Sequence, residues 1–326
     1  MENIEIITLQ RQRDFSRKMN ATFEFIKQNF KGLCKAIFYI SGPSVLIASV
    51  LLGSMIGDFF SVAVNSSMNP DIADNYFLSI SFWLQIIVMM VCFLLSTVMT
   101  ISTINNYIIL YDEKKTNQIE VSEVWERVRR SFWMYVGTTF LFTLVFIALY
   151  IVMIPFSFLG LASEAFLFLT LLLVYAGIIY FAVSSSMTYF IRSYENRGFF
   201  DALSRSFKLI KGEWWATFGF AIVIYFIMSS LASLIIIPFY VYILVVVLHT
   251  AEQGFNAGVP KSIEYGLIVF FALYYMISIV LYMLPNISIA FQYFNLVEMK
   301  EARGLISQID SIGQAAPEPK AEEEDF

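Results

Sequence analysis

The chain of 326 residues is poor in the side chains on which most protein chemistry depends. It has one histidine, His249, two cysteines, Cys34 and Cys92, and only 14% charged residues. A soluble domain carries about 25% charged residues, so this chain lacks the charge to cover a globule in water. Two cysteines in or beside apolar sequence are typical of small buried side chains and predict neither a disulfide nor a metal site. The scarcity of charge argues against a soluble fold and predicts lipid as part of the solvent.

Charge is missing from long stretches of the chain, and these stretches are apolar. The composition is 58% hydrophobic and the mean hydropathy is +0.70. A helix needs about 20 apolar residues to cross a membrane. Six stretches qualify, and Asp58 is the single charged residue in their interiors. The six predicted spans are 36–64, 76–110, 132–155, 165–191, 214–248 and 264–297.

Lysine and arginine gather on one side of these six stretches. Cytoplasmic loops of membrane proteins carry an excess of these two residues. Twenty of the 21 basic residues fall before the first stretch, in the loops after the second and fourth, or after the sixth, and Lys261 is the exception. We therefore expect a multi-pass protein of the bacterial cytoplasmic (inner) membrane with both termini in the cytoplasm. The polar N-terminal sequence lacks the apolar core of a cleavable signal peptide.

Amphipathic stretches stand next to the spans. In residues 195–215 apolar side chains recur in steps of three and four, and the basic residues lie off that stripe. Similar or weaker stripes precede the first and third spans and follow the sixth. An apolar face opposite a basic face is typical of a helix that lies in the membrane interface. We expect contact with lipid headgroups at Arg205, Lys208, Lys211, Lys27 and Lys31.

Short matches indicate an internal repeat. FWMYVG at 132–137 aligns with WWATFG at 214–219, and ENRGFF at 195–200 matches EARGLI at 301–306. The chain therefore divides into three units of the same orientation. The predicted fold class is an all-α polytopic membrane protein with six transmembrane helices in three helix-pair repeats, each preceded by an amphipathic interfacial helix.

The predicted domains follow from these patterns. Residues 1–35 form a cytoplasmic amphipathic interfacial segment, and residues 36–297 form the six-span membrane domain. Residues 298–313 form a C-terminal amphipathic helix. The acidic, proline-containing residues 314–326 are expected to be a disordered tail.

One junction also carries a family resemblance. The sequence GFFDALSRSFKLIKGEWWATFG, residues 198–219, resembles the Gly…Ala-Leu-x-x-Ser…Lys-Gly-x-x-Trp junction of uncharacterised bacterial multi-span proteins. These proteins are grouped loosely with the membrane domain of glycerophosphoryl diester phosphodiesterases, and the whole chain is similar to Bacteroidetes members of that group. The resemblance implies a six-helix membrane domain of unknown function. It does not imply phosphodiesterase activity, because that chemistry uses paired histidines and carboxylates in a separate soluble domain.

The sequence shows no catalytic set. It has no His-Glu-x-x-His motif, no paired carboxylates in facing spans and no glycine-rich phosphate loop. We expect His249 to be an ordinary residue at the membrane surface. Ionisable groups inside spans mark ion or proton paths, and their scarcity here argues against an ion-driven transporter. We therefore expect no enzyme activity, no cofactor, no metal and no nucleic-acid partner.

The uncharged polar residues of the spans leave two functions open. We expect them mainly to hydrogen-bond between helices, although a kink at Pro285 would free a neighbouring amide to line a cavity. The favoured function is a scaffold or subunit of a membrane complex, with a protein partner held by the cytoplasmic helices and tail. The alternative is a transporter or lipid-handling protein with a cavity between the spans. Candidate cavity residues are Asn286, Gln292, Asn105, Asn106 and Gln85.

Overall fold

The protein is helical throughout the part of the chain that the structure describes. A computed structural model describes residues 6–66, 71–159, 164–253 and 261–306, together with residue 309. Within these ranges there is no β-strand. The helices are α1 (Phe15–Ile40), α2 (Gly42–Ser66), α3 (Asp71–Leu78), α4 (Ile80–Lys114), α5 (Val121–Leu159), α6 (Glu164–Ser185), α7 (Thr188–Tyr194), α8 (Phe199–Ile210), α9 (Trp214–Gln253), α10 (Lys261–Leu281) and α11 (Met283–Glu301).

Six helical segments in the described ranges are long and apolar enough to cross a membrane. Their apolar side chains are largely uncovered by protein, and no residue in the most apolar 18-residue window of Ala165–Tyr194 is buried. An apolar helix that protein does not cover requires lipid around it. The predicted all-α polytopic fold with six spans is therefore confirmed. The segments are Gly42–Phe59, Ile80–Lys114, Val121–Val152, Ala165–Tyr194, Trp214–Tyr242 and Tyr265–Glu301.

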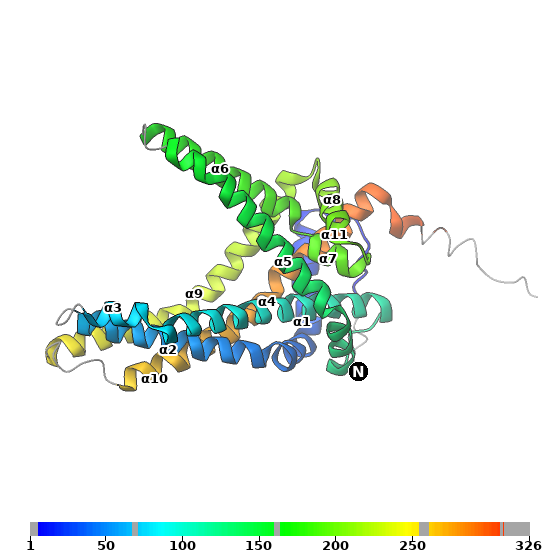
Figure 1. Cartoon of the computed structure of the whole chain (residues 1–326). Coiled ribbons are helices and arrows are strands. Elements are labelled where there is room, and N and C mark those ends of the chain that lie inside the picture. The colour runs from blue at the N-terminus through cyan, green and yellow to red at the C-terminus, as the bar shows by residue number, and fades with distance from the viewer. Residues whose placement is uncertain (1–5, 67–70, 160–163, 254–260, 307–308, 310–326) are drawn as a thin grey trace, which may run out of the picture.

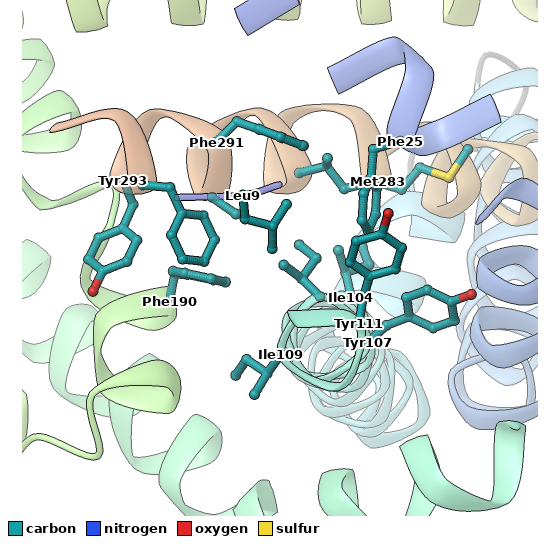
Figure 2. Close-up of a cluster of buried hydrophobic side chains, with 14 of the residues drawn as sticks. Leu9, Phe25, Ile104, Tyr107, Ile109, Tyr111, Phe190, Met283, Phe291 and Tyr293 are labelled. Atoms are coloured by element: carbon teal, nitrogen blue, oxygen red, sulfur yellow. The ribbon is translucent and has the colours of Figure 1, made fainter. Parts of the chain in front are cut away.

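The helices converge at one end of the molecule, which we call the hub. It consists of α1, α7, α8, α11 and residues 96–112 of α4 (Figure 1). Nearly all side chains of residues 100–112 are buried, whereas those of the preceding half of α4 are mostly exposed. The hub is thus the packed core of the fold. Large side chains in its hydrophobic cluster include Phe25, Tyr107, Phe190, Phe291 and Tyr293 (Figure 2).

The spans diverge as they leave the hub. Figure 1 shows α5 and α6 pointing away from α2, α3, α4 and α10, with α9 between the two groups. The most extensive helix pairing joins α2 to α10, which are far apart in the sequence. A Cβ at Gly53 would lie 2.5 Å from the Cα of Ile268, so the missing side chain lets the two backbones approach closely.

A left-handed residue stands at or just after the end of the second span of each pair. Lys115 directly follows α4 and Ala302 directly follows α11, whereas Asn196 comes after α7 and its cap Glu195; the φ angles of the three are 50°, 49° and 53°. A left-handed residue at this position stops an α-helix and turns the chain away from its axis. After each one the chain enters a further helical segment. The three endings thus share a left-handed residue near the helix end, and the internal repeat stays a prediction.

Two predicted boundaries of the N-terminal half need correction. α1 runs unbroken from Phe15 to Ile40, so the predicted boundary between residues 35 and 36 falls inside a helix. The Val121–Leu159 helix is also continuous, so no separate interfacial helix precedes the third span. Amphipathic periodicity locates the faces of a helix but not its ends, because an end depends on capping and on tertiary packing.

The predicted helix 298–313 is also interrupted. α11 ends at Glu301, and Ala302 caps it through an N–H bond to the carbonyl of Glu298. Residues 303–306 are helical again. The predicted acidic tail lies outside the described residues.

The segment before α1 lies inside the hub, although we predicted it to be part of an interfacial segment. Leu9 is only 2% exposed and lies between α11 and α4 (Figure 2). Burying a leucine contributes about 1.5–3 kcal/mol. The segment is therefore an integral part of the core. Three hydrogen bonds hold it, from Ile7 N to Tyr111 Oη (2.8 Å), from Gln10 Nε2 to Tyr194 Oη (3.1 Å) and from Arg13 N to Asn295 Oδ1 (2.6 Å).

Candidate functional site

Two adjoining cavities lie among the spans beside the hub. The larger cavity has a volume of about 280 Å³ and is lined by residues of α4, α5, α6, α7, α9 and α11. The smaller cavity, of about 160 Å³, lies between α6, α9 and α11. Four residues line both, so the cavities share one wall. These residues are Ala182, Ser186, Tyr225 and Ile289.

The larger cavity combines polar groups with apolar walls. Asn105 of α4 and Asn286 of α11 both line it, together with Phe142 and Phe146 of α5. Asn286 Nδ2 donates to the carbonyl oxygen of Tyr282 at 2.8 Å, in the break between α10 and α11. The structure thus brings two predicted cavity residues together.

Gln292, a third predicted cavity residue, lines the smaller cavity. Its Oε1 accepts a hydrogen bond from Lys18 Nζ at 2.6 Å, and its Nε2 donates to Thr217 Oγ1 at 2.9 Å. Much of the remaining wall is apolar, with Phe220 and Ile224 among its residues. The smaller cavity therefore combines a largely apolar wall with the hydrogen-bonding groups of Gln292 and Thr217.

The other two predicted cavity residues belong to helix–helix contacts, which corrects their assignment. Gln85 Nε2 donates to Ser54 Oγ at 3.0 Å and joins α4 to α2. Asn106 Nδ2 donates to Ser131 Oγ at 3.0 Å and joins α4 to α5. In an apolar surrounding these amides find partners on the next helix. Sequence alone could not separate them from Asn105, because the direction of a side chain depends on which neighbour packs against its face.

An ionic cluster closes the hub on the side of α8. Arg205 Nε donates to Glu195 Oε2 at 2.8 Å, and its Nη1 donates to Glu301 Oε1 at 2.7 Å. Arg303 Nη2 lies 2.7 Å from Glu301 Oε2 and 3.7 Å from Glu195 Oε1. The matching segments ENRG and EARG therefore meet in space. The Arg205 side chain is only 15% exposed, so the prediction that it contacts headgroups is wrong.

The charges of this cluster stabilise one another. Burial by itself raises the pKa of Glu195, but hydrogen bonds from Tyr293 and Arg205 and the charge of Arg205 outweigh burial, and the pKa lies below its usual value. The hydrogen bonds to Glu301 are the main reason that the pKa of Arg205 is raised. Both groups are therefore charged at neutral pH, and the cluster fixes α8 to α11.

The four predicted headgroup lysines have a different environment. Lys27, Lys31, Lys208 and Lys211 are all exposed. All four belong to or adjoin the hub helices α1 and α8. Contact with lipid headgroups fits this exposure and stays a prediction.

The sequence interpretation missed Lys18 and Thr217. Lys18 is 5% exposed and Thr217 is also 5% exposed. Lys18 was counted among the cytoplasmic basic residues, yet it shares a buried stripe of α1 with Thr22, Phe25 and Asn29 at helical spacing. This buried stripe was the sequence signal that could have identified Lys18 as a buried residue.

A hollow of about 510 Å³ lies outside the spans, between the N-terminal segment and α1. Its lining includes Arg11, Arg13 and Arg17. The guanidinium of Arg13 donates to backbone carbonyls, including that of Leu9 at 3.0 Å, and so fixes the segment. The other two arginines are exposed at the surface. The hollow is therefore a surface feature, and the hydrogen bonds of Arg13 beside it hold the N-terminal segment.

Metal-binding clusters are not found among the described residues, where no three His, Cys, Asp or Glu side chains come together. His249 lies in α9, and its side chain is outside the described part of the chain. Comparison of the chain with protein-family models, curated proteins and solved structures finds no match. The likeness of residues 198–219 to phosphodiesterase membrane domains therefore stays a prediction.

Proposed function

We propose that this chain is a non-catalytic membrane protein that binds a lipid in the cavities between its spans. The observation that carries the proposal is the pair of adjoining cavities, in which polar groups face apolar walls between helices that lipid surrounds. Ligand sites are concave, mostly apolar and equipped with a few placed polar groups. A lipid matches this composition because its chains are apolar and its head is polar.

The proposal selects the alternative that the sequence left open. A scaffold holding a protein partner remains the second candidate, and the large exposed apolar residues of the hub favour it. Phe200 of α8 is 71% exposed. A large exposed apolar residue on an amphipathic helix contacts a membrane surface equally well. The cavities, in contrast, have no role in a scaffold.

Filling the shared wall of the cavities tests lipid binding. Ala182 lines both cavities, so Ala182→Phe places a ring where the lipid would lie. Ala176→Phe adds the same ring to the exposed side of α6, and Ala176 lines neither cavity. Native mass spectrometry of protein released from nanodiscs counts the lipids that stay bound. We expect Ala182→Phe to lose a lipid that the wild type and Ala176→Phe keep. Equal retention in all three proteins would refute the proposal.

We also propose that the hub faces the cytoplasm of a bacterial inner membrane. The support is the excess of lysine and arginine at the hub end of the spans. Single cysteines at Asp74 and Arg129, in a protein without Cys34 and Cys92, test the orientation with a membrane-impermeant maleimide. We expect labelling of residue 74 in intact spheroplasts and of residue 129 only after lysis. The reverse pattern would overturn the assignment.

A further inference from the structure

Lys18 is a buried cation without a carboxylate partner in the described part of the chain. It is 5% exposed, and its Nζ makes one hydrogen bond, to Gln292 Oε1. The same Nζ lies 5.1 Å from the ring centroid of Phe220. An ammonium group has three hydrogens to donate, so Lys18 has donating capacity to spare. Burying a charge is costly unless an opposite charge or several hydrogen bonds compensate for it.

Two hydrogen bonds in series connect the charged group of Lys18 to the smaller cavity. Lys18 donates to the amide oxygen of Gln292, and the amide nitrogen of Gln292 donates to Thr217 Oγ1. Chains of this kind polarise each successive group in the same sense. The hydroxyl hydrogen of Thr217 meets no acceptor among the described residues, and Thr217 lines the cavity. The Thr217 hydroxyl, at the end of these two hydrogen bonds, is therefore a polarised hydrogen-bond donor to a ligand in the smaller cavity.

The charged groups around Lys18 leave this positive charge uncancelled at short range. Asp14 and Glu213 act on it through space, but neither forms an ion pair with it. Asp14 is bound to Arg17 at 3.3 Å. Burial lowers the pKa of Lys18, and the two carboxylates oppose this only in part. An anion in the cavity would supply the missing countercharge.

The position of the cavity matches the level of a lipid head. Thr217 lies three residues after Trp214, near the basic end of the fifth span. Tryptophan is enriched at the boundary between headgroups and acyl chains. Phe220 and Ile224 continue the wall along α9, away from that boundary. An acyl chain along these residues would place its head at Thr217 and Gln292.

We propose that the smaller cavity binds an acyl lipid through an anionic oxygen, a carboxylate or a phosphate, held at Thr217 and Gln292 and balanced by Lys18. The inference rests on the proposed lipid-binding function and adds the charge of the ligand. The competing explanation is structural, in which Lys18 only ties α1 to α11. The two explanations differ in whether the bound lipid is selected by charge.

The test compares three probes in phosphatidylcholine nanodiscs: oleate, phosphatidylglycerol and uncharged diacylglycerol. Native mass spectrometry measures how much of each stays bound to the wild type, to Ala182→Phe and to four further variants. Lys18→Met and Thr217→Val remove the charge and the hydroxyl. Lys27→Met removes an exposed charge from the same helix, and Thr143→Val removes an exposed hydroxyl from α5. The last two are matched controls.

We expect the wild type to retain an anionic probe about tenfold more than diacylglycerol, the factor that one charge-assisted hydrogen bond gives. Lys18→Met and Thr217→Val should abolish this preference, and both controls should keep it. Preference for oleate alone identifies a carboxylate, and preference for phosphatidylglycerol alone identifies a phosphate. A preference that survives Lys18→Met overturns the inference.

Two further outcomes separate this inference from the proposed lipid binding. If no preference exists but Ala182→Phe still releases diacylglycerol, the inference fails and lipid binding stands. If Ala182→Phe releases no probe, lipid binding fails.

Discussion

Glu195 and Glu301 bind the same guanidinium, that of Arg205, although they come from different thirds of the chain. Each is the first residue of a Glu-x-Arg-Gly segment; Glu195 directly follows α7, and Glu301 is the last residue of α11. Two similar segments thus meet around one arginine of α8. The arrangement connects the second and third pairs at the hub, so its integrity should control the stability of the hub.

Removing the shared guanidinium should destabilise the protein. Arg205→Met leaves the buried carboxylate of Glu195, which is 7% exposed, without its main partner. Breaking a buried ion pair on one side costs about 3–5 kcal/mol when the remaining charge has no other partner. Arg197 Nε, 2.5 Å from Glu195 Oε2, and Tyr293 Oη, 2.7 Å from Glu195 Oε1, remain as partners, so the loss should be below this range. We expect a clear decrease in the thermal unfolding midpoint in detergent. Lys208→Met removes a neighbouring charge of α8 without an ion pair among the described residues, and its midpoint should not change. Equal midpoints for both variants would contradict the role of the cluster.

The same cluster predicts a loss of stability in acid. The folded protein holds the pKa of Glu195 below its ordinary value of 4.5. A carboxyl group whose pKa is depressed on folding stabilises the protein above the unfolded pKa, and this contribution is lost as the pH falls through the folded pKa. The unfolding midpoint should therefore fall between about pH 5 and pH 3. Glu195→Gln should show a flatter decrease over this range, and Glu126→Gln, at an exposed position, should follow the wild type. A parallel decrease in all three would exclude Glu195 as the cause.

Truncating Leu9 should loosen the N-terminal segment. The side chain is 2% exposed in the hub, and a buried Leu→Ala change costs about 2–5 kcal/mol. We expect Leu9→Ala to lower the unfolding midpoint and to release the backbone at Arg11 and Arg13, so that trypsin cleaves there. Ile6→Ala, at a residue that is 39% exposed, serves as the control and should resist cleavage like the wild type. Unchanged cleavage in Leu9→Ala would mean that the segment does not depend on this anchor.

Two glycines should respond to alanine in opposite directions. A Cβ at Gly53 would lie 2.5 Å from the Ile268 backbone, so Gly53→Ala must push α2 away from α10 and lower stability. A Cβ at Gly219 would meet no atom within 4 Å. Gly219→Ala should therefore stabilise α9 by about 0.5–1 kcal/mol, because alanine loses less conformational freedom on folding. Unfolding in a denaturing detergent measures both changes, and destabilisation at both positions would contradict the packing argument.

The candidate site was only partly predictable from the sequence. Asn286 was singled out beside Pro285, and it lines the larger cavity near the break that precedes α11. Gln85 has the same polarity and a similar apolar context, yet it bonds to Ser54 on a neighbouring span. Lys18 reads as a surface residue in the sequence, and its burial depends on α11 and α9 covering it. Polarity gives a residue its chemistry, whereas its partner depends on distant segments.

By itself the sequence determined the medium and the number of crossings. A stretch of about 20 residues without charge tolerates only lipid or a protein core around it, and here six such stretches alternate with basic and non-basic connections. Only the tertiary structure decided that α10 lies along α2, that Leu9 enters the hub, and that Gln292 joins Lys18 to Thr217. Crossing a membrane is a local property of one helix, because its backbone hydrogen bonds close within the segment. The pairing of helices depends on shape and hydrogen bonding between surfaces far apart in the chain, which no local pattern records.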